Sequence, residues 1–256
     1  MKEIILAHLK EIEEEHDVRI LFAAESGSRA WGFESADSDW DVRFIYVHKA
    51  PWYFQIKDQR DVIECMLPGD VDAAGWDLRK ALQLMHRSNP SLFEWLHSPI
   101  IYRADPEFMS RISQIEPEFF DPAKSMYHYH SIYNKHNERC LQKPGFAIKR
   151  FLYYLRGILA CKWLEMHGTL PPVKFSQLLD ATVDDAGIKQ RVIRLIEMKK
   201  QRQECDLMLT DPSLMAYAHR WADYYDQRSK LVRPAASQGS PEQLNRLFYD
   251  IASSEK

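Results

Sequence analysis

The chain has 256 residues, a formal net charge of -3, and 45% hydrophobic and 28% charged residues. This composition is that of a globular protein with its own core, and it excludes a disordered or fibrous chain and a protein coated with positive charge for binding polyanions. Every apolar stretch is interrupted well before the roughly 20 residues that cross a bilayer, so no membrane span is expected.

The first third of the chain alternates helical and strand-like segments. Leu6, Leu9 and Ile12 recur at helical spacing among charged residues, which predicts an amino-terminal helix. Runs rich in β-branched and aromatic residues then predict strands at residues 18–24, 40–47, 61–66, 70–74 and 100–102. Asp77 is expected to cap a helix whose apolar residues share one face, namely Leu78, Ala81, Leu82 and Met85.

Strand-like alternation ends near residue 105, and the rest of the chain is predicted to be helical. Helical runs are expected near residues 123–141, 145–167, 184–205, 211–231 and 241–252, separated by turns that contain proline. The sequence therefore predicts an α+β protein, with a mixed sheet flanked by helices in residues 1–105 and an all-α helical bundle in residues 106–256.

The cysteines and the amino terminus indicate the compartment. The four cysteines are too widely spaced for a zinc knuckle and too few for a disulfide-stapled fold of this size. The amino terminus is rich in glutamate where a signal peptide would need an apolar core. We therefore expect a protein of the reducing cytoplasm.

Two carboxylates, Asp39 and Asp41, stand two residues apart on a predicted strand. Side chains at this spacing point to the same face, with Cα atoms roughly 6 to 7 Å apart. Paired carboxylate oxygens suit two Mg²⁺ ions about 3.5 to 4 Å apart, of which one activates a hydroxyl and the other neutralises a pyrophosphate leaving group. Asp39 and Asp41 are therefore candidate metal ligands.

A phosphate-binding turn is predicted upstream, where Gly27 and Ser28 join a strand to a helix. Free backbone N–H groups and the helix dipole favour a bound phosphate at such a junction. Glycine lets the backbone approach closely, the Ser28 hydroxyl can donate to a phosphate oxygen, and Arg29 is placed to add a charge-assisted contact.

These residues together resemble a known family. Gly27-Ser28, ten further residues and Asp39-Trp40-Asp41-Val42 match the glycine-serine and aspartate-x-aspartate signature of the DNA polymerase β nucleotidyltransferase superfamily. The longer strings at residues 25–33 and 37–43 look like one branch, the predicted bacterial and phage nucleotidyltransferases found beside RNA ligases. Similar strings at residues 75–81, 89–96 and 154–163 extend the resemblance over most of the chain. One departure is Ser26, where the superfamily usually has an apolar residue.

The resemblance implies an activity. It implies transfer of a nucleoside monophosphate from an NTP to a hydroxyl acceptor with release of pyrophosphate, by a two-metal mechanism that uses Mg²⁺ or Mn²⁺. It also implies a third carboxylate from a later strand, which binds metal and acts as the base; Asp72 is the candidate and Asp70 the reserve. The acceptor is left open, because RNA ends, protein side chains and small molecules all present hydroxyls.

The helical part supplies further candidates for nucleotide binding. Lys149, Tyr153 and Arg156 follow helical i, i+4, i+7 spacing, and in this hypothesis they contact the triphosphate from a domain that closes the nucleotide cleft. The alternative is an exposed stripe on a core helix. His128 and His130 are two residues apart on a predicted helix and therefore do not share a face for a metal.

The same residues exclude some other functions and leave two open. An EF-hand is excluded because Val42 stands where its loop requires glycine, and a P-loop because Phe33-Glu34 replaces the lysine and the hydroxyl residue. A non-catalytic protein of the same fold, which senses nucleotide or neutralises a partner, stays open. So does an RNA-binding module that uses the basic helical segment containing Arg150 and Arg156.

Overall fold

The computed structural model describes residues 1–140, 148–201 and 211–254, with the backbone alone at residues 136–140. The chain forms two compact units. The first unit consists of Met1–Ala30, Asp39–Phe120 and Ala236–Lys256, and the second of Trp31–Ser38 and Asp121–Ala235. Each unit is described by itself below.

A mixed five-stranded sheet forms the centre of the first unit. Its strands are β1 (Val18–Glu25), β2 (Trp40–His48), β3 (Val62–Leu67), β4 (Val71–Asp77) and β5 (Ile101–Ala104), arranged in the order β3-β4-β2-β1-β5. β2 and β4 run parallel, whereas the other neighbouring pairs are antiparallel. The predicted strands and the α+β class are confirmed.

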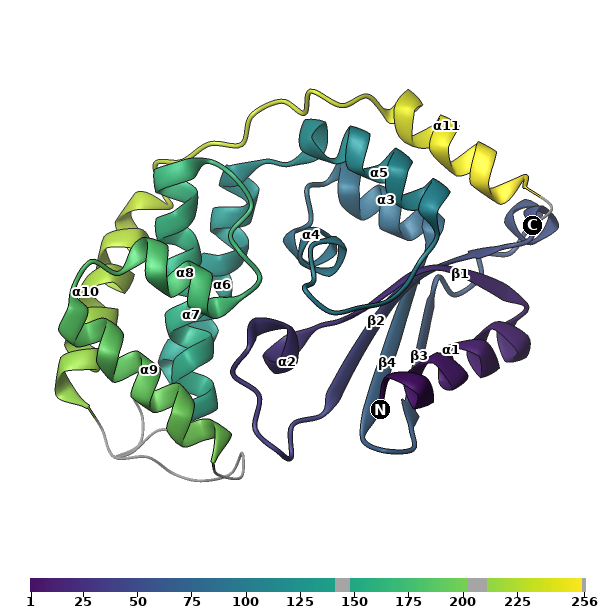
Figure 1. Cartoon of the computed structure of the whole chain (residues 1–256). Helices are drawn as coiled ribbons and strands as arrows, with labels where there is room; N and C mark the ends of the chain where they lie inside the picture. The colour runs from purple at the N-terminus through teal and green to yellow at the C-terminus, as the bar shows by residue number, and fades with distance from the viewer. Residues whose placement is uncertain (141–147, 202–210, 255–256) are drawn as a thin grey trace. The chain divides into compact units, whose positions relative to one another are not determined.

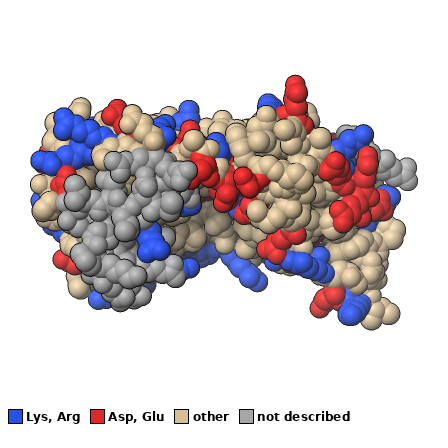
Figure 2. All heavy atoms as spheres, turned by 90° about the horizontal axis from the view of Figure 1, so that it is seen from below, with Lys and Arg blue, Asp and Glu red and all other residues tan. Residues whose placement is uncertain are grey.

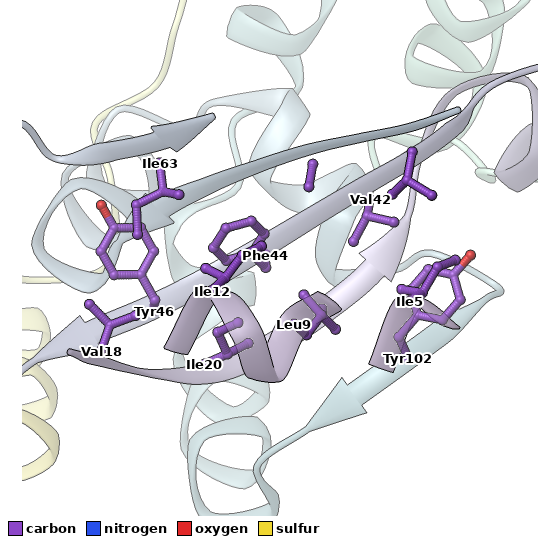
Figure 3. Packing of buried hydrophobic residues seen from close by; sticks show 13 residues of the cluster. Ile5, Leu9, Ile12, Val18, Ile20, Val42, Phe44, Tyr46, Ile63 and Tyr102 are labelled. Atoms are coloured by element: carbon purple, nitrogen blue, oxygen red, sulfur yellow. The ribbon is translucent and has the colours of Figure 1, made fainter. Parts of the chain in front are cut away.

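Helices cover both faces of this sheet (Figure 1). They are α1 (Lys2–His16), α3 (Leu78–His86), α4 (Pro90–Leu96), α5 (Pro106–Phe119) and α11 (Pro241–Ala252), with a 3₁₀ helix η1 (Ala50–Phe54) after β2. α1 packs on one face, where Ile5, Leu9 and Ile12 meet the inward side chains of the strands (Figure 3). α3, α4 and α5 pack on the strands as well, and α11 packs on α3 and α5.

Local sequence explains where these helices begin. The Asp77 side chain accepts a hydrogen bond of 2.8 Å from the Arg79 N–H, so Asp77 is the N-cap of α3 as predicted. The four predicted apolar residues of this helix are all buried. Asn89 caps α4 and Asp105 caps α5 in the same way, each followed by proline at the first helical position.

The second unit is helical. It contains α6 (Pro122–Cys140), α7 (Ile148–His167), α8 (Phe175–Thr182), α9 (Ala186–Lys200) and α10 (Pro212–Arg228). α6 and α7 pack along each other, and α8, α9 and α10 pack against α7. Four of the predicted helical runs are found here and the fifth, at residues 241–252, is α11 of the first unit; residues 141, 145–147 and 202–205 of those runs lie outside the described residues. No helix in the described part of the chain is long and apolar enough to cross a membrane.

The two compact units do not coincide with the division predicted at residue 105. α5 and α11 lie beyond that residue in sequence but belong to the first unit, because their apolar faces pack on the helices and strands around the sheet. Conversely, residues 31–38 leave the sheet region and pack in the second unit, where the Phe33 ring lies 5.5 Å from that of Phe175. It stays a prediction that residues 1–105 carry catalysis and that residues 106–256 close the nucleotide cleft.

Candidate active site

The Gly27-Ser28 turn follows β1 and begins α2 (Gly27–Trp31). Gly27 has a φ of 59°, and a Cβ atom built on it would lie 2.1 Å from Asp41 Oδ2. A hydrogen bond of 2.8 Å from the Ser26 N–H to the Asp41 carbonyl ties the turn to β2. The absence of a side chain at Gly27 therefore lets the turn and the Asp41 carboxylate lie against each other. Ser28 is buried at this junction.

Asp41 and Asp72 are direct neighbours on the two parallel strands β2 and β4. Val42 follows Asp41 and Ala73 follows Asp72, and both of these buried residues face α1. Because side chains alternate along a strand, both carboxylates point to the opposite face of the sheet. Their side chains are 28% and 40% exposed, which leaves both accessible to a ligand. The strand order brings together two of the three predicted carboxylates.

Arg43 joins these two carboxylates. Its Nη2 atom donates to Asp41 Oδ1 at 2.9 Å and to Asp72 Oδ2 at 2.8 Å, and its Nη1 donates to the Asp72 carbonyl at 2.8 Å. The planar guanidinium suits this role because it presents several N–H groups in fixed directions. Sequence reasoning missed Arg43, although its position two residues after Asp41 places it on the same strand face.

Asp39 lies immediately before β2 and is exposed, so it is not part of the strand on which it was predicted. Its backbone carbonyl accepts a hydrogen bond of 3.0 Å from Arg29 Nε, and the Arg29 guanidinium lies 3.8 Å from the centre of the Trp40 ring. Within the described ranges, no group of three carboxylate, histidine or cysteine side chains converges as a metal site. The predicted ligand set Asp39, Asp41 and Asp72 therefore stays a prediction.

The reserve candidate Asp70 lies in the turn before β4, with a φ of 57°. Its carbonyl accepts a hydrogen bond of 2.9 Å from the Trp40 N–H, which fixes the start of β2 beside the start of β4. Asp70 thus holds the register that sets Asp72 opposite Asp41, and the strand pairing favours Asp72 over Asp70 as the partner of Asp41.

A buried carboxylate, Glu25, supports the site from β1. One oxygen of Glu25 accepts a hydrogen bond of 2.9 Å from the Asp41 N–H, and the other accepts one from the Tyr102 hydroxyl. Burial raises the pKa of Glu25, and the nearby Asp41 charge raises it further, whereas the hydrogen bonds from Tyr102 and Asp41 lower it. Sequence reasoning missed this residue; the available signal was a glutamate directly after the apolar run at residues 20–24.

The three candidates of the helical part lie on α7 in the second unit. The Arg156 side chain is buried, and its guanidinium lies 4.3 Å from the centre of the Trp31 ring. The Tyr153 ring meets the same indole edge-on at 4.8 Å, while Lys149 is half-buried near the start of the helix. That these residues contact a nucleotide stays a prediction.

Two further features bear on binding sites: the surface charge and the histidines of α6. On the face drawn in Figure 2, acidic and basic side chains are interspersed. Of the two residues named in the predicted basic segment, Arg150 is exposed whereas Arg156 is buried, so these two do not share an exposed patch. His130 Nε2 lies 2.9 Å from Asp226 Oδ1, so it takes part in a contact between α6 and α10.

Comparison with known proteins identifies one family, through a family model that matches most of the chain. The family model described as "RNA repair pathway DNA polymerase beta family" matches residues 1–250. An uncharacterized protein of Bacillus subtilis (strain 168), YcgL, is 45% identical over 250 residues, which cover 98% of this chain and 96% of that protein. The crystal structure of a nucleotidyltransferase-like protein from Exiguobacterium sibiricum 255-15 is 12% identical, with coverage of 95% of this chain and 87% of that one. Its TM-score is 0.29, too low to carry an argument.

Proposed function

Since this chain belongs to the RNA repair pathway DNA polymerase beta family, we propose that it is a metal-dependent nucleotidyltransferase that transfers a nucleoside monophosphate from an NTP to a hydroxyl group of RNA. The observation that carries the proposal is the pairing of Asp41 with Asp72 on adjacent strands, directly against the Gly27 turn. In the reaction, the acceptor oxygen forms a bond to the α-phosphorus, the bond to the leaving pyrophosphate breaks, and the acceptor proton passes to a base.

In this proposal Asp41 and Asp72 hold the metal, Asp39 completes the ligand set, and Asp72 accepts the proton. Carboxylate oxygens are the donors that Mg²⁺ and Mn²⁺ prefer, and the partial exposure of Asp41 and Asp72 supports their assignment as ligands. A bound metal would supply charge neutralisation and activation of the hydroxyl. Gly27, Ser28 and Arg29 would hold the phosphates, and Lys149, Tyr153 and Arg156 would contact the nucleotide.

RNA is preferred to a protein acceptor because the family description names an RNA repair pathway. A reducing cytoplasmic location belongs to the same proposal. The second candidate is a nucleotide-sensing protein of this fold without catalysis. The buried Glu25 and the Arg43 bridge maintain a charged arrangement that a purely structural strand pair does not need, and this supports a functional site at Asp41 and Asp72.

The test is transfer of label from each α-³²P-labelled NTP, with Mg²⁺ or Mn²⁺, to cellular RNA or to cellular protein. Asp41→Asn and Asp72→Asn are expected to abolish transfer with the fold unchanged. Asp70→Asn is the matched control, since it makes the same chemical change two residues before Asp72 and asparagine tolerates a positive φ. It should retain transfer.

The outcomes separate the candidates. Label in protein but not in RNA would change the acceptor class. NTP binding without transfer to either fraction would favour the sensing protein. Undiminished turnover in Asp41→Asn would remove the proposed mechanism.

A further inference from the structure

A groove on the second unit lies between the C-terminal half of α7 and the middle of α10. It has a volume of about 580 Å³ and is lined by Lys162, Glu165, Met166, Arg220, Trp221, Tyr224 and Tyr225. This volume is within the range of sites that bind organic ligands. No part of the candidate active site described above lines it.

The lining is aromatic. The Trp221 and Tyr225 rings lie nearly parallel, with an interplanar angle of 21° and centroids 6.1 Å apart, and the Tyr224 ring meets the indole edge-on at 5.6 Å. Tyr225 is buried, whereas Tyr224 is 45% exposed. The buried ring thus supports the indole from within, and the Tyr224 ring is open to a flat ligand.

The charges of the groove favour an anionic ligand. Lys162 Nζ lies 4.3 Å and the Arg220 guanidinium 5.5 Å from the centre of the Trp221 ring. The acid of the lining, Glu165, accepts hydrogen bonds from Tyr224, Tyr225 and Arg228 at 2.7 to 3.1 Å. The Arg228 guanidinium neutralises the Glu165 charge. Asp184 lies 3.8 Å from Lys162 but is 97% exposed, so solvent screens it.

We propose that this groove binds a single-stranded segment of RNA, with a base against the Tyr224 and Trp221 rings and its phosphate at the exposed Arg220, while the largely buried Lys162 adds positive charge to the groove wall. Aromatic rings flanked by cations are the elements with which proteins bind unpaired nucleotides, because every base has a face to stack and every nucleotide a phosphate. A duplex keeps its base faces stacked and is therefore excluded. The inference concerns binding alone and does not depend on catalysis.

The test is fluorescence anisotropy of a labelled single-stranded oligoribonucleotide of about 12 nucleotides, with no NTP and no divalent ion. Tyr224→Leu removes the ring and is expected to weaken binding about tenfold. Tyr224→Phe keeps the ring and loses only the bond to Glu165, so it should bind like the wild type. Arg220→Glu should weaken binding and reduce its dependence on salt. Arg194→Glu, at an exposed position on α9, makes the same change in net charge away from the groove and should have a smaller effect.

A second measurement avoids variants altogether. An oligoribonucleotide that contains 2-aminopurine should lose fluorescence when the base stacks on the rings of the wild-type protein. Equal affinity of Tyr224→Leu and Tyr224→Phe for RNA, with both folded by circular dichroism, would overturn the proposal. Absence of RNA binding by the wild type would also overturn it, as would binding of poly-glutamate in place of RNA.

Discussion

At the scale of single residues, Gly27 combines a positive φ with close contact to a carboxylate. Alanine at this position would adopt a strained backbone and push its Cβ against Asp41 Oδ2. We expect Gly27→Ala to lower the free energy of unfolding by about 1–3 kcal/mol and to reduce transfer strongly, since Asp41 must move. Urea unfolding and the labelling assay measure the two effects.

Gly168→Ala is the matched control for this prediction. Gly168 has a φ of 65°, and no heavy atom lies within 4 Å of a Cβ built there. The Gly168→Ala variant therefore incurs only the backbone strain, about 1 kcal/mol, and should leave transfer unchanged. Equal loss of transfer in both glycine variants would contradict a specific role for the contact with Asp41.

Arg43 provides a second prediction at this scale. Its single positive charge offsets part of the negative charge of Asp41 and Asp72, which the proposal assigns to the metal. We expect Arg43→Gln to be less stable without metal, because the two carboxylates then repel each other, and to bind Mg²⁺ about tenfold more tightly. Thermal unfolding with increasing Mg²⁺ should show a larger stabilisation than in the wild type. An identical response of both proteins would remove these carboxylates from the metal site.

Part of the site was predictable from sequence, and the reason differs from residue to residue. The signature identified Gly27 and Asp41, because their spacing is local. Asp72 came from the resemblance. A sequence suggests that β4 pairs with the preceding strand β3, but only the observed strand order shows that β4 also pairs with β2. Glu25 and Arg43 were missed because their roles consist of hydrogen bonds across strands, which a linear spacing does not contain.

At the scale of elements, the strands and the helices with clear periodicity were predicted well, and the short helices were not. α4 and α8 have seven and eight residues, too few to show a helical period. α5 carries Pro117 near its C-terminal end, where sequence reasoning ends a helix. The β2 strand was predicted over residues 40–47, and its last residue, the half-buried His48, was not.

His48 connects β2 to η1 and makes the stability of this connection depend on pH. Its ring stacks on Trp52 at 3.9 Å, and burial, with a contribution from His16, lowers its pKa from 6.5 to about 4 against the opposing effect of Asp17. The unfolded chain therefore takes up the proton first as the pH falls. Stability contributed by neutral His48 is present above about pH 6.5 and is lost as the pH falls toward about 4.

The variant His48→Phe retains a ring against Trp52 but does not titrate. Between about pH 7.5 and about pH 5, we expect the free energy of unfolding of the wild type to fall relative to that of His48→Phe, by on the order of 1 kcal/mol because the ring is partly solvent-screened. Urea unfolding at both pH values measures the difference. Parallel pH profiles of the two proteins would show that His48 titrates normally in the folded state.

At the scale of the whole molecule, the first unit is assembled from segments far apart in sequence. The Gln238 and Gly239 N–H groups donate to the Glu118 carbonyl at 3.2 and 3.1 Å, so the chain returns to the end of α5 after the helices of the second unit. α11 then buries Leu244, Leu247 and Ile251 within the first unit. A linear boundary at residue 105 cannot represent this arrangement, because periodicity identifies helices but not their packing partners.

This arrangement predicts which fragments fold. A fragment of residues 1–105 lacks the three buried apolar residues of α5 and those of α11, each contributing about 1.5–3 kcal/mol, and their sum equals or exceeds the total stability of a typical domain. We expect it to be unfolded by circular dichroism. Residues 1–120 joined to 236–256 by about four glycine and serine residues should unfold cooperatively in urea, since the joined ends are adjacent. A cooperative transition in the 1–105 fragment at the same urea concentration would show that α5 and α11 are not required for the sheet to fold.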